Sequence, residues 1–501
     1  MSNVFLNGLK DATNFTYTEN GALTHKTTKS DLLDMFALGG AFRNRSEDDV
    51  ITLFHNALKE NEAYAMKCLF YLRDIRGGQG ERRFFRICLR FLGNAYPEIA
   101  LRNLEYIPFV GRWDDVIYAF EGTRIEKEAF EFIVKQLSLD VESKTPSLLA
   151  KWLPSENASS LETKRLGNLT RTYLNMSHKQ YRKTLSILRE RINIVERLMS
   201  EGRWDEIEFD KIPSKAGLKY RNAFARKDIL KERYKTFMTS DNTTVNAKAL
   251  YPYDVVHNAI EEMDGYWGAD ANRIDAVQRA ALNKYWDNLA DYIQGKVFNG
   301  MAVVDTSGSM YGRPMEVAVS LGMYCAEKAQ GPYHDHFITF SAHPELQRIQ
   351  GKDFCAKVAN ILKADWGANT NISAVFDLLL NTAIKNHCSQ DEIPQNVIII
   401  SDMEFDYCVT ATSNWRDRGN FDKTTLFEDI KQKWAAHGYE MPKLIFWNVD
   451  ARQNNIPMKD DGNVCYVSGF SPILFEQILE NLGAYDLMMN KLNDKRYENI
   501  H

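Results

Sequence analysis

The stretch Met301-Ala302-Val303-Val304-Asp305-Thr306-Ser307-Gly308-Ser309 decides the fold of this chain. Its first four residues are apolar and predict a buried strand. The next five place one carboxylate and two hydroxyls at alternate positions on a tight loop. Such hard oxygen ligands suit a divalent cation, Mg²⁺ above all. Open α/β sheets bind their ligands beyond the carboxyl ends of parallel strands. The stretch therefore predicts a strand that ends in a cation site.

Two later segments place further oxygen-bearing side chains at the end of a helix or strand. A polar loop, Trp366 to Asn371, opens an apolar helix over 372–384, and the apolar run 397–400 ends in Ser401-Asp402. Strands alternating with helices of ten to fifteen residues are typical of a parallel sheet with both faces covered. The further elements expected are strands over 336–340, 443–449 and 464–467 and helices over 315–329 and 472–482. Residues 297–501 are thus predicted to form an α/β, doubly wound, Rossmann-like domain.

This constellation resembles the von Willebrand factor A domain and its metal-ion-dependent adhesion site. The resemblance implies Mg²⁺, or Mn²⁺ or Ca²⁺, and assigns the metal to Asp305, Ser307, Ser309, Thr370 and Asp402. In that family the metal keeps an open position that a carboxylate of a protein partner fills. The alternative for these residues is a polar turn followed by an Asp that caps a helix.

Residues 1–296 are predicted to be almost wholly helical, with no sheet of their own. Apolar residues recur at the helical spacing in the segments 50–59, 63–75, 82–92, 127–137 and 181–199. The motif that begins Gly111-Arg112-Trp113-Asp114 returns as Gly202-Arg203-Trp204-Asp205. This echo favours a HEAT-like array of stacked helix pairs, in which Trp113 and Trp204 would occupy equivalent, largely buried places.

Helical repeats followed by a von Willebrand A domain resemble the Ro autoantigen family, whose helical part is the TROVE module. The resemblance is closest to a group of TROVE-like proteins of phages and cells. It rests on the segments 72–82, 108–115 and 212–215. It implies a TROVE-like helical domain over 1–296, repeats that close into a ring, and a function as a scaffold for small or misfolded RNA.

The distribution of charge also favours RNA. The whole chain has a net charge of −5, whereas residues 151–250 hold 21 Lys and Arg against 12 Asp and Glu. Thr163 to Arg189 contains no acid. Basic faces of this kind attract phosphate backbones, although a solvated helix face would have the same composition. The expected RNA-binding residues are Lys164, Arg165, Arg171, His178, Lys179, Arg182, Lys183, Lys215 and Lys219.

Other classes of function have little support in the sequence. No run approaches the length of a membrane span, the first residues lack a secretory signal, and the seven Cys form no C-x-x-C pair. These features favour a cytoplasmic protein. The Gly-rich segment 76–83 lacks the pattern of a phosphate loop and fits a turn between helices. Glu404, near the proposed metal, fits a surface residue. We expect no enzyme and no specificity for DNA.

The sequence therefore favours an RNA-binding scaffold whose metal site docks a protein partner. One alternative remains. It is a protein-interaction adaptor whose A domain recruits a carboxylate-bearing partner, such as a MoxR-type AAA+ ATPase.

Overall fold

The computed structural model describes residue 9 and residues 13–501, except 193, 266–267, 294, 341–343, 364–370, 407–424, 461 and 481. Its contacts divide the chain into two compact units. The sheet unit comprises Met1–Cys68 and Leu250–Asp494, and the helical unit comprises Leu69–Ala249 and Lys495–His501. The division by contacts therefore differs from the one expected at 296/297.

The sheet unit contains every strand of the described residues. The strands are β1 (Phe15–Tyr17), β2 (Leu23–His25), β3 (Gly300–Asp305), β4 (His336–Phe340), β5 (Glu345–Arg348), β6 (Asn396–Ser401), β7 (Lys443–Asn448) and β8 (Val464–Ser468). Its helices are α2 (Asp31–Leu38), α3 (Glu47–Glu60), α16 (Pro252–Glu262), α17 (Ala276–Asp287), α18 (Arg313–Lys328), α19 (Phe354–Ile361), α20 (Ile372–Asn386), α21 (Leu426–Ala436), α22 (Phe475–Ile478) and α23 (Ala484–Leu492). Helix α4 (Glu62–Arg73) crosses from this unit into the other.

Six of the strands form one mixed sheet in the order β5-β4-β3-β6-β7-β8. All neighbours are parallel except β4 and β5, which are antiparallel. In the centre, Val303 lies opposite Ile338 on one side and Ile399 on the other. The central strands are buried except at Asn396, the first residue of β6, as continuous apolar runs predict for a sheet that is covered on both faces.

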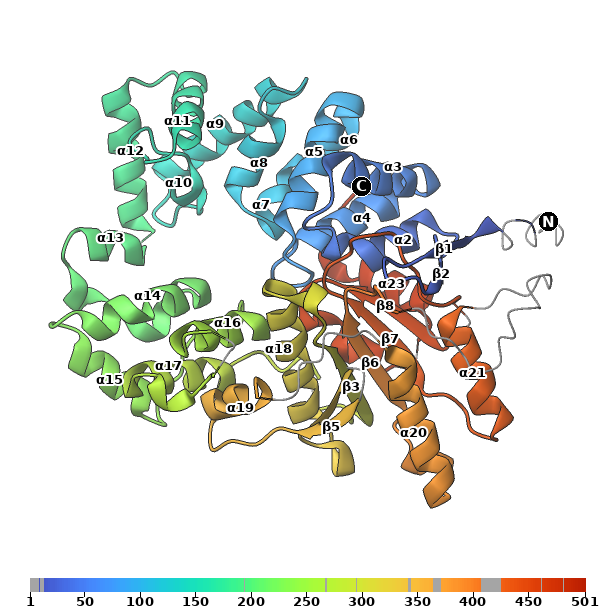
Figure 1. Ribbon diagram of the computed structural model, residues 1–501. Helices are drawn as coiled ribbons and strands as arrows, with labels where there is room; N and C mark the ends of the chain where they lie inside the picture. The colour runs from blue at the N-terminus through green and yellow to red at the C-terminus, as the bar shows by residue number, and fades with distance from the viewer. Residues whose placement is uncertain are drawn as a thin grey trace. The chain divides into compact units, whose positions relative to one another are not determined.

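Helices pack against this sheet along its length. Helix α18 contacts β3, β4 and β6, while α20 contacts β4 and the neighbouring α21 (Figure 1). Gly322 lets α18 approach β3 closely, because a Cβ there would lie 2.4 Å from Cγ2 of Val304. This covering leaves the carboxyl ends of the parallel strands as the edge at which loops can form a site.

The N-terminal segment belongs to the sheet unit, and this corrects the prediction that residues 1–296 have no sheet. Strands β1 and β2 form an antiparallel hairpin. Helix α2 is buried from Leu32 to Leu38 and contacts β8. Gly40 follows it so closely that a Cβ would lie 2.6 Å from the carbonyl oxygen of Ser468. Apart from Asp31 and Asp34 this helix is apolar, so it requires burial over most of its surface, and β8 provides part of that cover.

The helical unit consists of helices in a row, most of which pack on near neighbours in the sequence (Figure 1). Such local packing is expected of stacked helices. Of the helices that the structure describes, none is long and apolar enough to cross a membrane. The helices after α4 are α5 (Arg82–Ala95), α6 (Pro97–Arg102), α7 (Ile107–Val110), α8 (Trp113–Phe120), α9 (Glu126–Glu142), α10 (Leu149–Trp152), α11 (Leu161–Tyr173), α12 (His178–Arg191), α13 (Val195–Ser200), α14 (Ser214–Arg226) and α15 (Lys231–Thr239).

The echo of the Gly-Arg-Trp-Asp motif does not mark equivalent positions. Trp113 begins the α-helix α8, is buried and stacks on Phe132 with ring centroids 5.2 Å apart. Trp204 begins a 3-10 turn and is only half-buried, with the Lys227 ammonium 5.0 Å from its ring centroid. The prediction of two matching repeats was therefore wrong, although the helical character that it supported is correct.

Candidate functional site

The loop after β3 brings its carboxylate and hydroxyls together. Asp305 is completely buried at the end of the strand. Its Oδ1 accepts a hydrogen bond from the Ser307 backbone N–H at 2.9 Å, and its Oδ2 accepts one from the Ser401 hydroxyl at 2.6 Å. The hydroxyls of Ser307 and Ser309 are hydrogen-bonded at 2.9 Å. Residues 301–309 therefore form the predicted strand and, after it, a polar loop at the sheet edge.

The loop after β6 contributes the second aspartate at the same edge, because β3 and β6 are parallel neighbours. Asp402 is 1% exposed, and its Oδ1 accepts a hydrogen bond from the Glu404 N–H at 3.2 Å. Among the described residues, its Oδ2 has no hydrogen-bond partner. Thr370, the remaining predicted ligand, lies outside the described residues.

Two buried carboxylates at one edge have an electrostatic cost. Burial and the negative charge of Asp402 raise the pKa of Asp305 above its usual range. Burial likewise raises the pKa of Asp402, against the opposing effects of the Ser309 hydroxyl, the Glu404 N–H and the Arg452 guanidinium. A bound cation would remove this cost. Within the described part of the chain, no three His, Cys, Asp or Glu side chains cluster as a metal site, so hydroxyls would have to complete the ligand set.

Arg452 is a neighbour of this site that the sequence did not reveal. Its Nη2 lies 3.6 Å from Oδ2 of Asp402 and donates a hydrogen bond to the Ser309 carbonyl at 2.5 Å. Its Nη1 donates to Glu19, at the tip of the β1–β2 hairpin, at 3.1 Å. These residues are far apart in the chain, so no local pattern could have connected them.

The expectation that Glu404 is a surface residue was wrong. Its side chain is 1% exposed. Its two carboxylate oxygens accept hydrogen bonds from the Glu19 backbone N–H at 2.6 Å and from the Asn455 amide at 2.8 Å. Burial raises its pKa to about 7. Glu404 therefore fastens the β1–β2 hairpin to the sheet edge beside Asp402.

Six of the nine basic residues predicted to bind RNA fall into two groups in the helical unit. Arg165, Arg171 and His178 are held by acids. Arg165 pairs with Glu121 and Glu162, and Glu156 accepts hydrogen bonds from Arg171 at 2.9 Å and from His178 at 2.8 Å. These three side chains support the packing of α11 and α12, and their charges are largely neutralised.

The second group lies on α12. Lys179, Arg182 and Lys183 are exposed and, as far as the described residues show, form neither ion pairs nor side-chain hydrogen bonds. Their spacing of three and four residues places them on one face of the helix. A capping box between Ser177 and Gln180 starts the helix just before them. The remaining predicted residues are Lys164, which is half-buried, and Lys215 and Lys219, which are exposed on α14.

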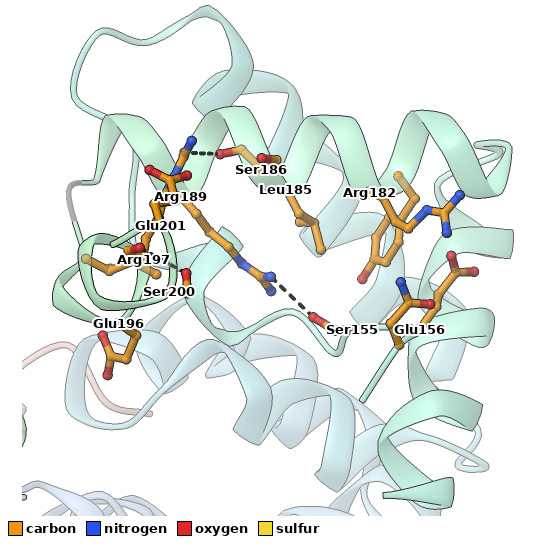
Figure 2. A pocket seen from close by; sticks show the side chains of 13 residues that line it. Ser155, Glu156, Arg182, Leu185, Ser186, Arg189, Glu196, Arg197, Ser200 and Glu201 are labelled. Atoms are coloured by element: carbon orange, nitrogen blue, oxygen red, sulfur yellow. Dashed lines mark hydrogen bonds and ion pairs between the residues drawn. The ribbon is translucent and has the colours of Figure 1, made fainter. Parts of the chain in front are cut away.

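A cavity of about 440 Å³ lies beside this face (Figure 2). Arg189 lines the cavity and donates hydrogen bonds to the Ser155 hydroxyl at 3.2 Å and to the Ala150 carbonyl at 2.8 Å. The Arg197 guanidinium donates to Glu201 at 2.5 Å and to the Ser186 carbonyl at 2.7 Å. Helix α12 ends at Arg191, before Arg197, so the helix predicted over 181–199 is in fact two helices.

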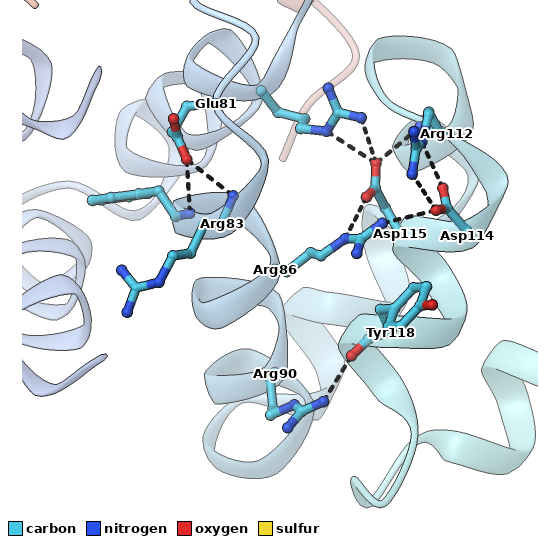
Figure 3. Close-up of polar contacts among 10 residues, drawn as sticks. Glu81, Arg83, Arg86, Arg90, Arg112, Asp114, Asp115 and Tyr118 are labelled. Atoms are coloured by element: carbon cyan, nitrogen blue, oxygen red, sulfur yellow. Dashed lines mark hydrogen bonds and ion pairs between the residues drawn. The ribbon is translucent and has the colours of Figure 1, made fainter. Parts of the chain in front are cut away.

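The segments 72–82 and 108–115 contribute to an arginine–aspartate network at α5 and α8 (Figure 3). Asp115 is completely buried, and its carboxylate accepts hydrogen bonds from the guanidinium groups of Arg73 and Arg86 and from the Arg112 N–H. Asp114 pairs with Arg86 and Arg112. The Gly-rich segment 76–80 is a turn between α4 and α5, as predicted.

Comparisons with known proteins cover both parts of the chain. A family model described as a domain of unknown function, DUF2828, matches residues 18–118 and 136–297, and another, DUF7788, matches residues 299–499. An uncharacterized protein of Acanthamoeba polyphaga mimivirus is 30% identical over 510 residues, which cover 93% of this chain and 85% of that protein. The crystal structure of the Deinococcus radiodurans RO (RSR) protein aligns with a TM-score of 0.47 and 13% identity, over 94% of this chain and 100% of that one.

Proposed function

The chain belongs to the family that shares the DUF2828 domain, and we propose that it is an RNA-binding scaffold that holds RNA by its phosphates on α12. The observation that carries the proposal is the set of Lys179, Arg182 and Lys183, which share one exposed helix face. Within the described residues, none of the three forms an ion pair with an acid. Cations in this state are free to exchange counterions for a phosphate backbone.

The cavity beside α12 supports single-stranded rather than duplex RNA as the ligand. Its volume of about 440 Å³ is within the range of small-ligand pockets. Hydroxyl, guanidinium and carboxylate groups line it, among them Ser155, Arg189 and Glu201. Such groups can form hydrogen bonds with the edges of a base that has left its stack. Phosphates would lie along Arg182, and an unstacked base would enter the cavity.

The test is a titration of full-length protein with a short single-stranded RNA at several salt concentrations. The triple variant Lys179→Ala, Arg182→Ala, Lys183→Ala should bind more weakly. Its salt dependence should be flatter by up to about 2 in log–log slope, because each lost phosphate contact removes roughly 0.7.

The matched control removes three lysines that already have acidic partners in the helical unit: Lys127, Lys211 and Lys231. Replacing these three by Ala changes the net charge equally but should leave binding nearly unaltered. Equal losses of affinity in both triple variants, or no RNA retained at low salt, would contradict RNA binding on α12. The protein-interaction adaptor would then be the better-supported function.

We further propose that the sheet unit is a von Willebrand A-type domain that binds Mg²⁺ or a similar divalent ion at its edge. The residues present fit such an ion. The Oδ2 atom of Asp402 is buried and, in the described part of the chain, lacks a hydrogen-bond partner. The hydroxyls of Ser307 and Ser309 lie nearby on the neighbouring loop. Asp305, Ser307, Ser309 and Asp402 would hold the ion, and Thr370 would join them. A carboxylate of a protein partner would complete its coordination.

A further inference from the structure

The arginine–aspartate network contains more positive than negative charge. Arg73, Arg82, Arg86 and Arg112 interact electrostatically with one another or with Asp115. Asp114 and Asp115 are the acids of the network. Four guanidinium groups against two carboxylates leave a surplus of two positive charges.

The two aspartates already accept hydrogen bonds from three of the arginines. Asp115 Oδ2 accepts hydrogen bonds from Arg73 Nη2 at 2.7 Å and from the Arg112 N–H at 2.9 Å, and its Oδ1 accepts from Arg86 Nε at 2.6 Å. Asp114 accepts from Arg86 Nη2 at 3.0 Å and from Arg112 Nε at 2.8 Å. Arg82 feels the charge of Asp115 but, among the described residues, forms an ion pair with neither carboxylate.

Arg82 stands at the first position of α5, one turn before Arg86. It is exposed, and among the described residues its guanidinium makes no hydrogen bond or ion pair. Although the side chain reaches solvent, its partial desolvation by the surrounding protein and the positive charge of its arginine neighbours, Arg112 foremost, lower its pKa. A cation held among like charges with no partner is unfavourable for folding, so a structural role does not explain it.

Aromatic rings fix two of the other guanidinium groups. Arg112 lies over the Trp152 ring, 3.9 Å from its centroid, and Arg86 lies over the Tyr118 ring at 4.3 Å. Figure 3 shows both arginines at Asp114, with Tyr118 beside Arg86 and with the Arg83 side chain directed away from them. Each guanidinium has five N–H donors, so Arg86 and Arg112 keep donors beyond those used by the aspartates. The remaining N–H donors of these two guanidinium groups are thus held in place and available to a ligand.

We propose that Arg82, Arg86 and Arg112 form a binding site for a phosphate group. Three guanidinium groups offer more donors than the two oxygens of a planar carboxylate can accept, whereas a phosphate presents three strong acceptor oxygens. A phosphate monoester carries a charge of about −1.5 to −2 at neutral pH, which matches the surplus of the network. This site is separate from the α12 face and does not depend on it.

The first experiment uses inorganic phosphate as the probe. Thermal unfolding of the full chain is followed in phosphate and in chloride at equal ionic strength. Phosphate should raise the midpoint of the wild type by clearly more than that of Arg82→Gln. Without phosphate, Arg82→Gln should be at least as stable as the wild type, since the substitution relieves repulsion between like charges.

The matched control is Arg124→Gln, which removes an exposed arginine beyond the other end of α8. This variant should respond to phosphate as the wild type does. Phosphate also stabilises folded proteins generally by exclusion from their surface, and this effect would be equal in all three proteins. Equal shifts in the three proteins, or no shift in the wild type, would overturn the proposed site.

A second experiment identifies the source of the phosphate. One short RNA is prepared with a 5′-phosphate and with a 5′-hydroxyl, and its binding to wild type and Arg82→Gln is compared. Roughly tenfold weaker binding of both RNAs by the variant would identify backbone phosphates, and a loss confined to the phosphorylated RNA would identify the terminal phosphate. Unchanged RNA binding, with the phosphate-dependent shift in midpoint retained, would identify a free phosphate or a small phosphate ester.

Discussion

At the scale of single residues, Asp115 is a fully buried acid of the helical unit that arginines hold in its charged form. Burial opposes its ionisation, but the charges of Arg73 and Arg86 and their hydrogen bonds outweigh burial and lower the pKa of Asp115. Arg73 is itself only 4% exposed, and its guanidinium forms two hydrogen bonds with Asp115. The pair therefore depends on both partners.

We predict that Asp115→Ala destabilises the protein by about 3–5 kcal/mol, because it leaves the buried charge of Arg73 without its partner. The measurement is the free energy of unfolding from urea denaturation. Asp228→Ala is the control, since Asp228 and Lys231 form an exposed pair that contributes about 0–1 kcal/mol. Equal losses in the two variants would show that the network does not support the fold.

Sequence alone could identify Asp114 and Asp115 as part of a motif but not their partners. Arg73 and Arg86 precede Asp115 by 42 and 29 residues, and no periodicity connects such distances. The same limit applies at the sheet edge, where Asp305, Ser307, Ser309 and Asp402 were predicted from strand ends. Arg452 and Glu19 reach that edge from remote loops and were missed.

At the scale of elements, strands with continuous apolar runs were predicted and those without them were not. The central strands β3, β6 and β7 each contain such a run, and all formed where expected. Strand β5 is Glu345-Leu346-Gln347-Arg348, an exposed edge strand whose pairing with β4 comes from backbone hydrogen bonds. The three-residue strands of the β1–β2 hairpin were too short for any alternation to be visible.

Two helices of the sheet unit are joined by a titratable contact. His257 on α16 forms a hydrogen bond of 2.9 Å through Nδ1 with Glu316 on α18. Glu261, on the same helix as His257, lies 3.3 Å from its Nε2. The hydrogen bond with Glu316, against burial, raises the pKa of His257 above its ordinary value of 6.5.

A histidine whose pKa is raised on folding stabilises the protein fully below its unfolded pKa, and this contribution is lost as the pH rises through the folded pKa. We predict that His257→Gln lowers the unfolding midpoint in urea at about pH 6 and has a smaller effect at about pH 8. His437→Gln is the control, since the His437 ring bonds the carbonyl of Lys433. A loss that is equal at both pH values would contradict the contact between α16 and α18 as the cause.

At the scale of the whole molecule, the chain has a mostly helical part and a part built on a mixed sheet. The sequence predicted these two parts and their order. It could not predict that residues 1–68 group with the sheet. Helix α2 (Asp31–Leu38) is mostly apolar, and such a helix could pack in the core of either unit. The docking of Gly40 against Ser468 reveals its place.

The charges of the two units suit ligands of opposite sign, a cation at the sheet edge and an anion on α12. Binding of the two ligands can therefore be tested separately in the whole molecule. The sheet edge combines buried carboxylates with hydroxyls, whereas α12 combines exposed cations. We predict that Mg²⁺ stabilises the wild type against thermal unfolding, by about 2.7 kcal/mol at a hundred times its Kd. Asp305→Ala and the isosteric Asp305→Asn should lose this response, because each removes the buried carboxylate that the ion would neutralise.

The same variants should retain RNA binding with an unaltered salt dependence, because Asp305 belongs to the sheet unit whereas Lys179 and Lys183 belong to the helical unit. Asp391→Ala, which removes an exposed carboxylate of the sheet unit, controls for general effects of Mg²⁺ and should respond as the wild type does. A Mg²⁺ response that persists in both Asp305 variants would refute the metal site. A loss of RNA binding in those variants would instead show that the cation at the sheet edge governs the helical surface, and that the two ligands are coupled.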